Sequence, residues 1–215
     1  CLIFNSPIDL FIIHESKSEH LISSRLTSIP LLKRIESINI KDDTTLENVG
    51  LGDNTLNNVT SATRGVALGR YALWQLTEGS YNTGVGAGAL YSTTTGYSNT
   101  GIGVGALDQN VTGNENTALG AFALYTTSTG SSNSAVGSQA LRYNSTGANN
   151  TAVGKEALVT NTTASNNTAV GYQAAYANTT GTLNVAVGHT ALASNTTASN
   201  NTAVGHASLN ANTTG

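Results

Sequence analysis

The sequence predicts an all-β fold in which a parallel β-solenoid of ten 17-residue coils follows a short segment without repeats. The first observation is a period: glycine recurs, without one insertion, at positions 52, 69, 86, 103, 120, 137, 154, 171, 188 and 205. The second is that the columns on either side of this glycine keep their chemical character from copy to copy. The third is length, because such a unit is too short to bury a core alone and is about half a helical hairpin repeat.

The chain of 215 residues changes composition sharply near residue 47. All 23 glycines lie at or after Gly50, whereas residues 1–47 hold both prolines, five of the nine Lys and Arg, and seven of the twelve Asp and Glu. We therefore predict a non-repeat N-terminal segment, 1–47, and a solenoid, 48–215. The net charge of −3 gives no electrostatic reason to expect nucleic acid as a partner. No apolar run is long enough for membrane insertion.

We expect residues 1–47 to form a cap or attachment module, since an uncapped β-stack exposes an adhesive edge. The alternative is a partly ordered linker. The spacing of the apolar residues between Ser18 and Ile40 is ambiguous between a helix and a strand, and Pro30 interrupts them. The segment also holds four polar residues that we interpret as a solvated face rather than a metal site: His14, Glu15, Glu19 and His20.

Each coil is expected to begin with a strand-like triplet, as in Thr168-Ala169-Val170, followed by a glycine turn. A second strand-like piece and an N-T-T-G turn complete the consensus N-T-A-V-G-x-x-A-L-x-x-N-T-T-G-x-x. Coils stacked in register with a rise of about 4.8 Å give a rod roughly 45–50 Å long. We expect the aliphatic residue before the glycine to face the interior. The small residue before that is expected to point the other way, with another backbone close to it.

Three columns carry further structural predictions. The invariant glycine is expected at positive φ, which other residues adopt only at a steric cost. A second glycine column, where Ala62, Ala164 and Ala198 also occur, is expected to need small size rather than positive φ. The Asn four residues before the invariant glycine, replaced once by Gly65, is expected to form an amide ladder along the axis.

No set of residues has the spacing of a catalytic, cofactor-binding or metal-binding site. The G-x-G-x-G run at 84–88 belongs to the repeat and lacks the βαβ context and basic partner of a phosphate-binding loop. His189 and His206 lie one coil apart, so their rings should stack. In a trimer they would form a metal or pH-sensitive ring; the alternative is a tolerant exposed column. We predict a protein that is not an enzyme and has no cofactor.

Two columns suggest surface roles. One contains the glycosylation sequons at Asn144, Asn161, Asn178, Asn195 and Asn212, so that a glycosylating host would coat one edge of the rod with sugar. The alternative is that Asn-Thr-Thr suits the turn. The other is a partial aromatic column, which is suited either to stacking against glycans or to packing under the turn: Trp74, Tyr91, Tyr125 and Tyr176.

The repeats resemble the head repeats of trimeric autotransporter adhesins, and they are still more similar to Asn/Thr-rich repeats of phage and large-virus tail-fibre proteins. The resemblance covers residues 48–215 and rests on units such as Asn150-Thr151-Ala152-Val153-Gly154. It implies a left-handed parallel β-roll in which three chains pack around a central axis. The small-residue column fits such close packing between chains. A membrane-anchor barrel, a heptad stalk and a C-terminal chaperone domain, found in members of these families, have no counterpart here.

We therefore expect a homotrimeric, extracellular fibre shaft that holds an adhesive tip away from a virion or cell surface. Its partners would be other fibre or baseplate proteins at the N-terminal end. One alternative is a trimeric adhesin head that binds host-surface glycans or matrix. Another is a subunit of an open-ended extracellular filament. A monomeric ice-binding solenoid would need a flat T-x-T array, whereas the Thr pairs of the consensus are adjacent and lie in a turn.

Overall fold

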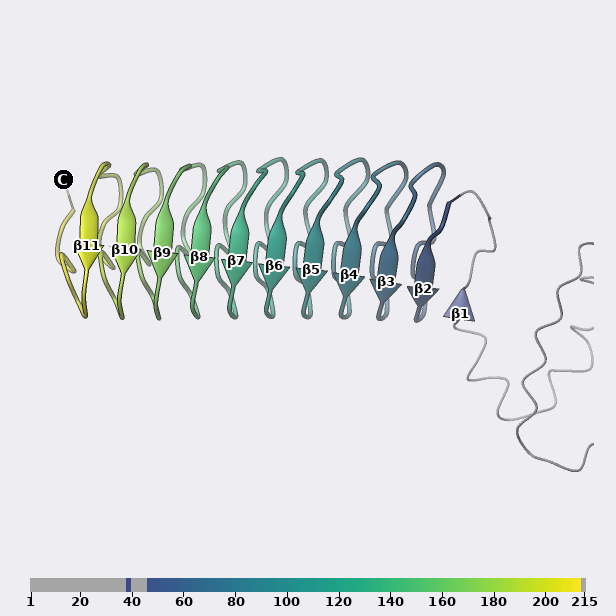
Figure 1. Cartoon of the computed structure of the whole chain (residues 1–215), viewed down its shortest axis with the longest axis horizontal. Helices are drawn as coiled ribbons and strands as arrows, with labels where there is room; N and C mark the ends of the chain where they lie inside the picture. The colour runs from purple at the N-terminus through teal and green to yellow at the C-terminus, as the bar shows by residue number, and fades with distance from the viewer. Residues whose placement is uncertain (1–37, 40–45, 214–215) are drawn as a thin grey trace, which may run out of the picture. The chain divides into compact units, whose positions relative to one another are not determined.

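The computed structural model describes residues 38–39 and 46–213, and the predicted solenoid is confirmed. The described part contains strands and turns but no helix, so none that could cross a lipid bilayer. One strand of three residues occurs in each repeat, and the strands lie side by side along the rod (Figure 1). They are β2 (Val49–Leu51), β3 (Val66–Leu68), β4 (Thr83–Val85), β5 (Thr100–Ile102), β6 (Thr117–Leu119), β7 (Ser134–Val136), β8 (Thr151–Val153), β9 (Thr168–Val170), β10 (Val185–Val187) and β11 (Thr202–Val204).

Strands β2 to β11 form one parallel sheet in which each residue pairs with the residue of the same column in the next coil. Ala152 in β8, for example, pairs with Ala135 in β7 and with Ala169 in β9. A short strand β1 (Ile38–Asn39) pairs antiparallel with β2 and thereby covers the first edge of the sheet. The rest of the segment 1–45, including the four residues considered for a metal site, lies outside the described residues, and the cap stays a prediction.

The strand side chains point the opposite way from the prediction, because the small residue faces the interior and the aliphatic residue faces outward. The small residue at the centre of each strand is buried, as Ala152 and Ala169 are, whereas Val153 beside it is 37% exposed. Opposite the centre of each strand, the interior has room for little more than a methyl group. A Cβ built on Gly84 would lie 3.2 Å from the carbonyl oxygen of Ala89, on the opposite wall of the same coil. The close backbone inferred from the small residues therefore belongs to the same chain and not to a neighbour.

The predicted second strand is also wrong, because the A-L-x piece is a turn. In a strand that forms one wall of a coil, adjacent side chains would point alternately into the interior and out of it, whereas Ala157 and Leu158 are both fully buried in a turn. The turn places Leu158 at φ 50, and the same left-handed conformation recurs at every equivalent leucine. The leucine side chains thereby fill the interior between successive coils. Nine of them occur with Ala175 in this column: Leu56, Leu73, Leu90, Leu107, Leu124, Leu141, Leu158, Leu192 and Leu209.

Both glycine predictions are confirmed. The invariant glycines have φ between 123° and 139°, a range that side chains rarely adopt. The glycines of the second column, of which Gly147 and Gly181 are examples, do not have positive φ, so their small size is what the fold requires. The Asn ladder is confirmed as well. In this column, the side-chain oxygen of each Asn from Asn82 to Asn184 accepts a hydrogen bond from the backbone N–H of the Asn one coil later, at 2.9–3.0 Å.

Candidate binding surfaces

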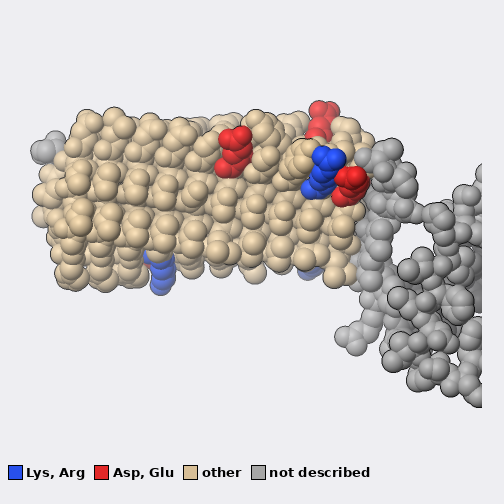
Figure 2. Space-filling model, in the orientation of Figure 1, with Lys and Arg blue, Asp and Glu red and all other residues tan. Residues whose placement is uncertain are grey.

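The outer face of the sheet is a continuous, uncharged strip. It consists of the first and third residues of every strand, so that Thr, Val or, once, Ser134 alternates with Val, Leu or Ile across the strip. In the space-filling view of this side, the Lys, Arg, Asp and Glu side chains lie toward the upper and lower margins and leave the middle band free (Figure 2). Several of its aliphatic residues are well exposed: Leu51, Ile102, Leu119, Val136, Val153 and Val204.

The threonines that begin most strands face outward, in addition to the Thr pairs that lie in the turns. Thr100 and Thr117, for example, pair in adjacent strands β5 and β6. The column beside them is aliphatic, however, so the strip is a T-x-V array and not the T-x-T array expected of an ice-binding face.

Aromatic side chains gather in the first half of the rod, in the turns that follow strands β3, β4 and β6. The rings of Trp74 and Tyr91 stack with centroids 5.0 Å apart, and Tyr71 meets both of them edge-on. Farther along, Phe122 and Tyr125 pack edge-to-face at 5.6 Å. We call these five residues, with Asp108 between them, the aromatic patch. Tyr176, the fourth residue of the predicted aromatic column, lies apart from it and is 38% exposed.

Two residues beside the aromatic patch were missed at the level of sequence. Arg142 continues the column, and its guanidinium carbon lies 5.9 Å from the centre of the Tyr125 ring and 5.5 Å from that of Phe122. Arg70 lies 4.7 Å from the centre of the Tyr71 ring. The period could have found Arg142, because it places Trp74, Tyr91, Asp108, Tyr125 and Arg142 in one column, whereas Arg70 lies in another column.

The Asp108 carboxyl group, in the column between Tyr91 and Tyr125, has a raised pKa. It is half-buried, and this burial raises its pKa from 3.8 to about 6. No ion pair or side-chain hydrogen bond to its carboxylate is made within the described ranges, where the ion pairs join Arg64 to Glu47 and Lys155 to Glu156. At neutral pH the group is therefore a charge held in a partly desolvated place without a counter-ion.

Replacement of this carboxylate should stabilise the protein at neutral pH. A carboxyl whose pKa is raised in the folded state favours folding most below its unfolded pKa, and this advantage is lost as the pH rises from about 4 to about 6. We expect Asp108→Asn to increase the free energy of unfolding at pH 7.5 by about 1 kcal/mol, after allowance for solvent screening of a half-exposed group. At pH 3.5 the difference from the parent should disappear. Thermal unfolding of both proteins at the two pH values measures it.

The control for this prediction is Glu115→Gln, which removes the charge of an exposed carboxylate. It should leave the melting temperature nearly unchanged at both pH values. An Asp108→Asn variant that is less stable than the parent at pH 7.5 would show instead that the carboxylate makes a favourable contact.

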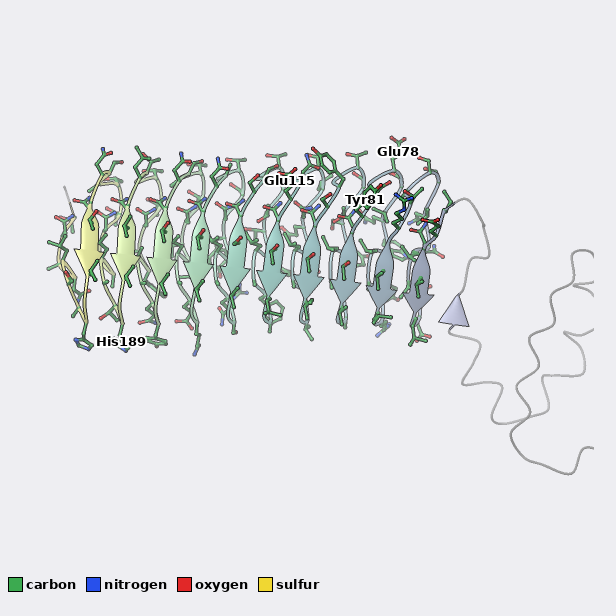
Figure 3. The ribbon with its side chains drawn as sticks, viewed as in Figure 1. Glu78, Tyr81, Glu115 and His189 are labelled. Carbon is green, nitrogen blue, oxygen red and sulfur yellow. The ribbon has the colours of Figure 1, made fainter. Side chains whose placement is uncertain are left out.

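The predicted histidine stack is confirmed. The rings of His189 and His206 lie 5.1 Å apart and nearly parallel, and Tyr172 continues the stack at the same spacing. Figure 3 shows His189 pointing away from the rod at one edge, with Glu78, Tyr81 and Glu115 at the other. Within the described part of the chain, no three His, Cys, Asp or Glu side chains come together in a way that could hold a metal ion.

The sequon column supports the turn rather than glycosylation. Asn144, Asn161, Asn178 and Asn195 are fully buried, and each amide donates a hydrogen bond to the carbonyl oxygen three residues later, at 2.9–3.0 Å. Neighbouring amides also bond to one another along the axis, as from Asn161 Nδ2 to Asn144 Oδ1 at 2.8 Å. An Asn held in this way has no room for a glycan, so the column forms a second internal ladder.

No protein-family model, curated protein or solved structure matches the chain. The function is therefore argued from the surfaces described above.

Proposed function

We propose that the solenoid is the shaft of a homotrimeric extracellular fibre, which holds an adhesive tip away from a virion or cell surface. The observation that carries this proposal is the uncharged strip on the outer face of the sheet. Ten coils at the strand spacing give a strip about 45 Å long and about 10 Å wide. A continuous uncharged strip with an aliphatic residue in every coil differs from the singly scattered apolar residues of an ordinary soluble surface and favours an interaction site.

The occupant that this strip fits best is another copy of the same chain. The strip repeats every 17 residues along the rod, and a second copy repeats with the same spacing, so that aliphatic and Thr rows match over the whole length. It carries no charge that a copy would have to neutralise or repel. Three copies related by a three-fold axis bury all three strips together in the centre of the fibre, and the charged margins remain in water.

A mechanical role agrees with the rest of the molecule. Backbone hydrogen bonds between coils and two internal Asn ladders tie each coil to its neighbours along the axis. Such a rod resists bending, because bending would lengthen these bonds on one side. The uniform coils favour stiffness, and the small number of charged residues offers few groups for specific chemistry.

Light scattering coupled to size exclusion tests the assembly. We expect a mass of about three times the 22.0 kDa chain. A second measurement uses Val136→Lys with Val153→Lys, which places two charges one coil apart in the strip. Burying six ammonium groups at a three-fold axis is prohibitive, so this variant should have the mass of one chain.

The matched control is Thr146→Lys with Thr163→Lys. These residues are also exposed and one coil apart, but they lie in the turn outside the strip. The control should keep the mass of the parent, and both variants should keep its far-ultraviolet circular dichroism. A parent mass of one chain would overturn the trimer and favour a lone binding solenoid. A very large, heterogeneous mass would favour an open-ended filament.

A further inference from the structure

The aromatic patch has the composition of a site for an organic cation. Its six residues come from four successive coils, and Asp108 stands in the column between Tyr91 and Tyr125, one coil from each. Neighbouring coils of a parallel β-stack are about 4.8 Å apart, so the carboxylate lies between two aromatic rings that are separated by about 10 Å. Partial burial of an unpaired carboxylate costs free energy, and a bound cation would reduce this cost by neutralising the charge.

Space beside the carboxylate is provided by Gly88. The only heavy atom within 4 Å of a Cβ built on Gly88 is the Oδ2 atom of Asp108, at 3.3 Å. The left-handed backbone does not demand glycine at this position, because Tyr71 and Phe122 occupy the same column at φ 59 and 57. Gly105, by contrast, is covered by the rings of Phe122 and Tyr125, which would lie 3.0 Å and 3.4 Å from its Cβ. The carboxylate is therefore open on the side of Gly88 and enclosed on the other.

The rings supply the second half of the site. The face of an aromatic ring is negative and attracts cations. Trp74 covers one face of Tyr91, so the other face is turned along the rod toward the coil of Asp108. Elsewhere the protein places its own cations on comparable rings: Arg70 on Tyr71, Arg142 on Tyr125 and Lys155 on Tyr172. Within the described residues, Tyr91 has no such cation.

We propose that the aromatic patch binds an alkylammonium group, with the Asp108 carboxylate as its counter-ion and the Tyr91 ring as the surface against which it packs. The ligand class includes quaternary ammonium head groups and the primary ammonium of a lysine or an amino sugar. A neutral sugar would stack on the rings equally well but would leave the half-buried charge uncompensated. This inference does not depend on the fibre function, since every contact comes from one chain.

Trp74 is the only tryptophan of the chain and stacks on Tyr91, so its fluorescence reports on the site. The experiment is a titration of the full chain with choline chloride and, separately, with butylammonium chloride, against sodium chloride at equal ionic strength. We expect a saturable change in Trp74 fluorescence with one or both ammonium salts and none with sodium chloride. The stronger of the two responses identifies a quaternary or a primary ammonium as the preferred ligand.

Two variants make the test specific. Asp108→Asn keeps the shape of the side chain and should weaken binding at least about tenfold, because the charge of the counter-ion is lost. Glu115→Gln removes a carboxylate outside the patch and should bind as the parent does. A response equal to that of sodium chloride, or one that Asp108→Asn retains in full, would overturn the proposal. A response to methyl glucoside but not to the ammonium salts would assign the patch to a neutral sugar instead.

Discussion

Replacement of Gly154 by alanine should lower the free energy of unfolding by at least about 3 kcal/mol. Gly154 has φ 132°, where a side chain is strained. The added Cβ would also lie 2.6 Å from the carbonyl carbon of Gly171, which is backbone of the next coil and cannot turn aside. The two coils must therefore separate at a place where their strands pair, between β8 and β9. Denaturant unfolding followed by circular dichroism measures the loss.

The matched control is Gly84→Ala, the same substitution at the buried centre of strand β4. Seven other strands have alanine in this column, and a Cβ at Gly84 finds its nearest neighbours at 3.2 Å and 3.4 Å. Its effect should stay within about 1 kcal/mol of the parent, with either sign. Equal losses in the two variants would mean that any methyl group added to a coil is costly, and that the invariant column has no special role.

The period and the turn chemistry were predictable because they act on single columns. An uninterrupted 17-residue repeat leaves only stacked coils as a solution, and the strands β2 to β11 have the expected register. The positive φ of Gly154, the stacking of His189 on His206 and the Asn ladder follow from the same reasoning. In each case, one residue type repeated along the axis meets its own copy in the next coil.

The direction of the strand side chains was not predicted correctly, because hydrophobicity favours Val153 inside while packing requires Ala152 there. Two features of the sequence indicate the observed direction of these side chains. The central column contains only Ala and Gly, which indicates a narrow interior, whereas the column of Val153 mixes Val, Leu and Ile, whose shapes differ too much for one tight space. The aliphatic residues are left outside, and there they form the strip that we propose as the interface between chains.

The aromatic patch could be predicted only in part from the sequence. The column of Trp74 and Tyr91 was recognised, but Tyr71 and Phe122 belong to a column three residues earlier, and only the turn brings the two columns together. Asp108 lies in the same column but was not singled out from the sequence. Its half-burial between rings, and the space beside it at Gly88, depend on the left-handed turn that the predicted second strand did not contain.

Replacement of Asn150 by leucine should also be severe, with an expected loss of about 3–5 kcal/mol. The fully buried Asn150 side chain donates to Asn133 Oδ1 at 3.1 Å and to the carbonyl oxygen of Ala164 at 2.8 Å. Its own Oδ1 accepts from the backbone N–H of Asn167 at 3.0 Å. Leucine has a similar volume but makes none of these bonds, so the Asn167 N–H is left buried without its partner, and the Ala164 carbonyl keeps only its bond from Asn161 Nδ2. Thermal and denaturant unfolding measure the effect.

Asn149→Leu is the control for this ladder prediction, because it makes the same substitution one residue earlier, where the side chain is exposed. The backbone there is left-handed, with φ 57, and leucine already occurs in the same column at Leu183 with the same φ. The control should cost about 1 kcal/mol or less. If Asn150→Leu cost no more than Asn149→Leu, the ladder would be a consequence of coil stacking rather than a cause of it. A large difference would show that the buried amides hold each coil on the next.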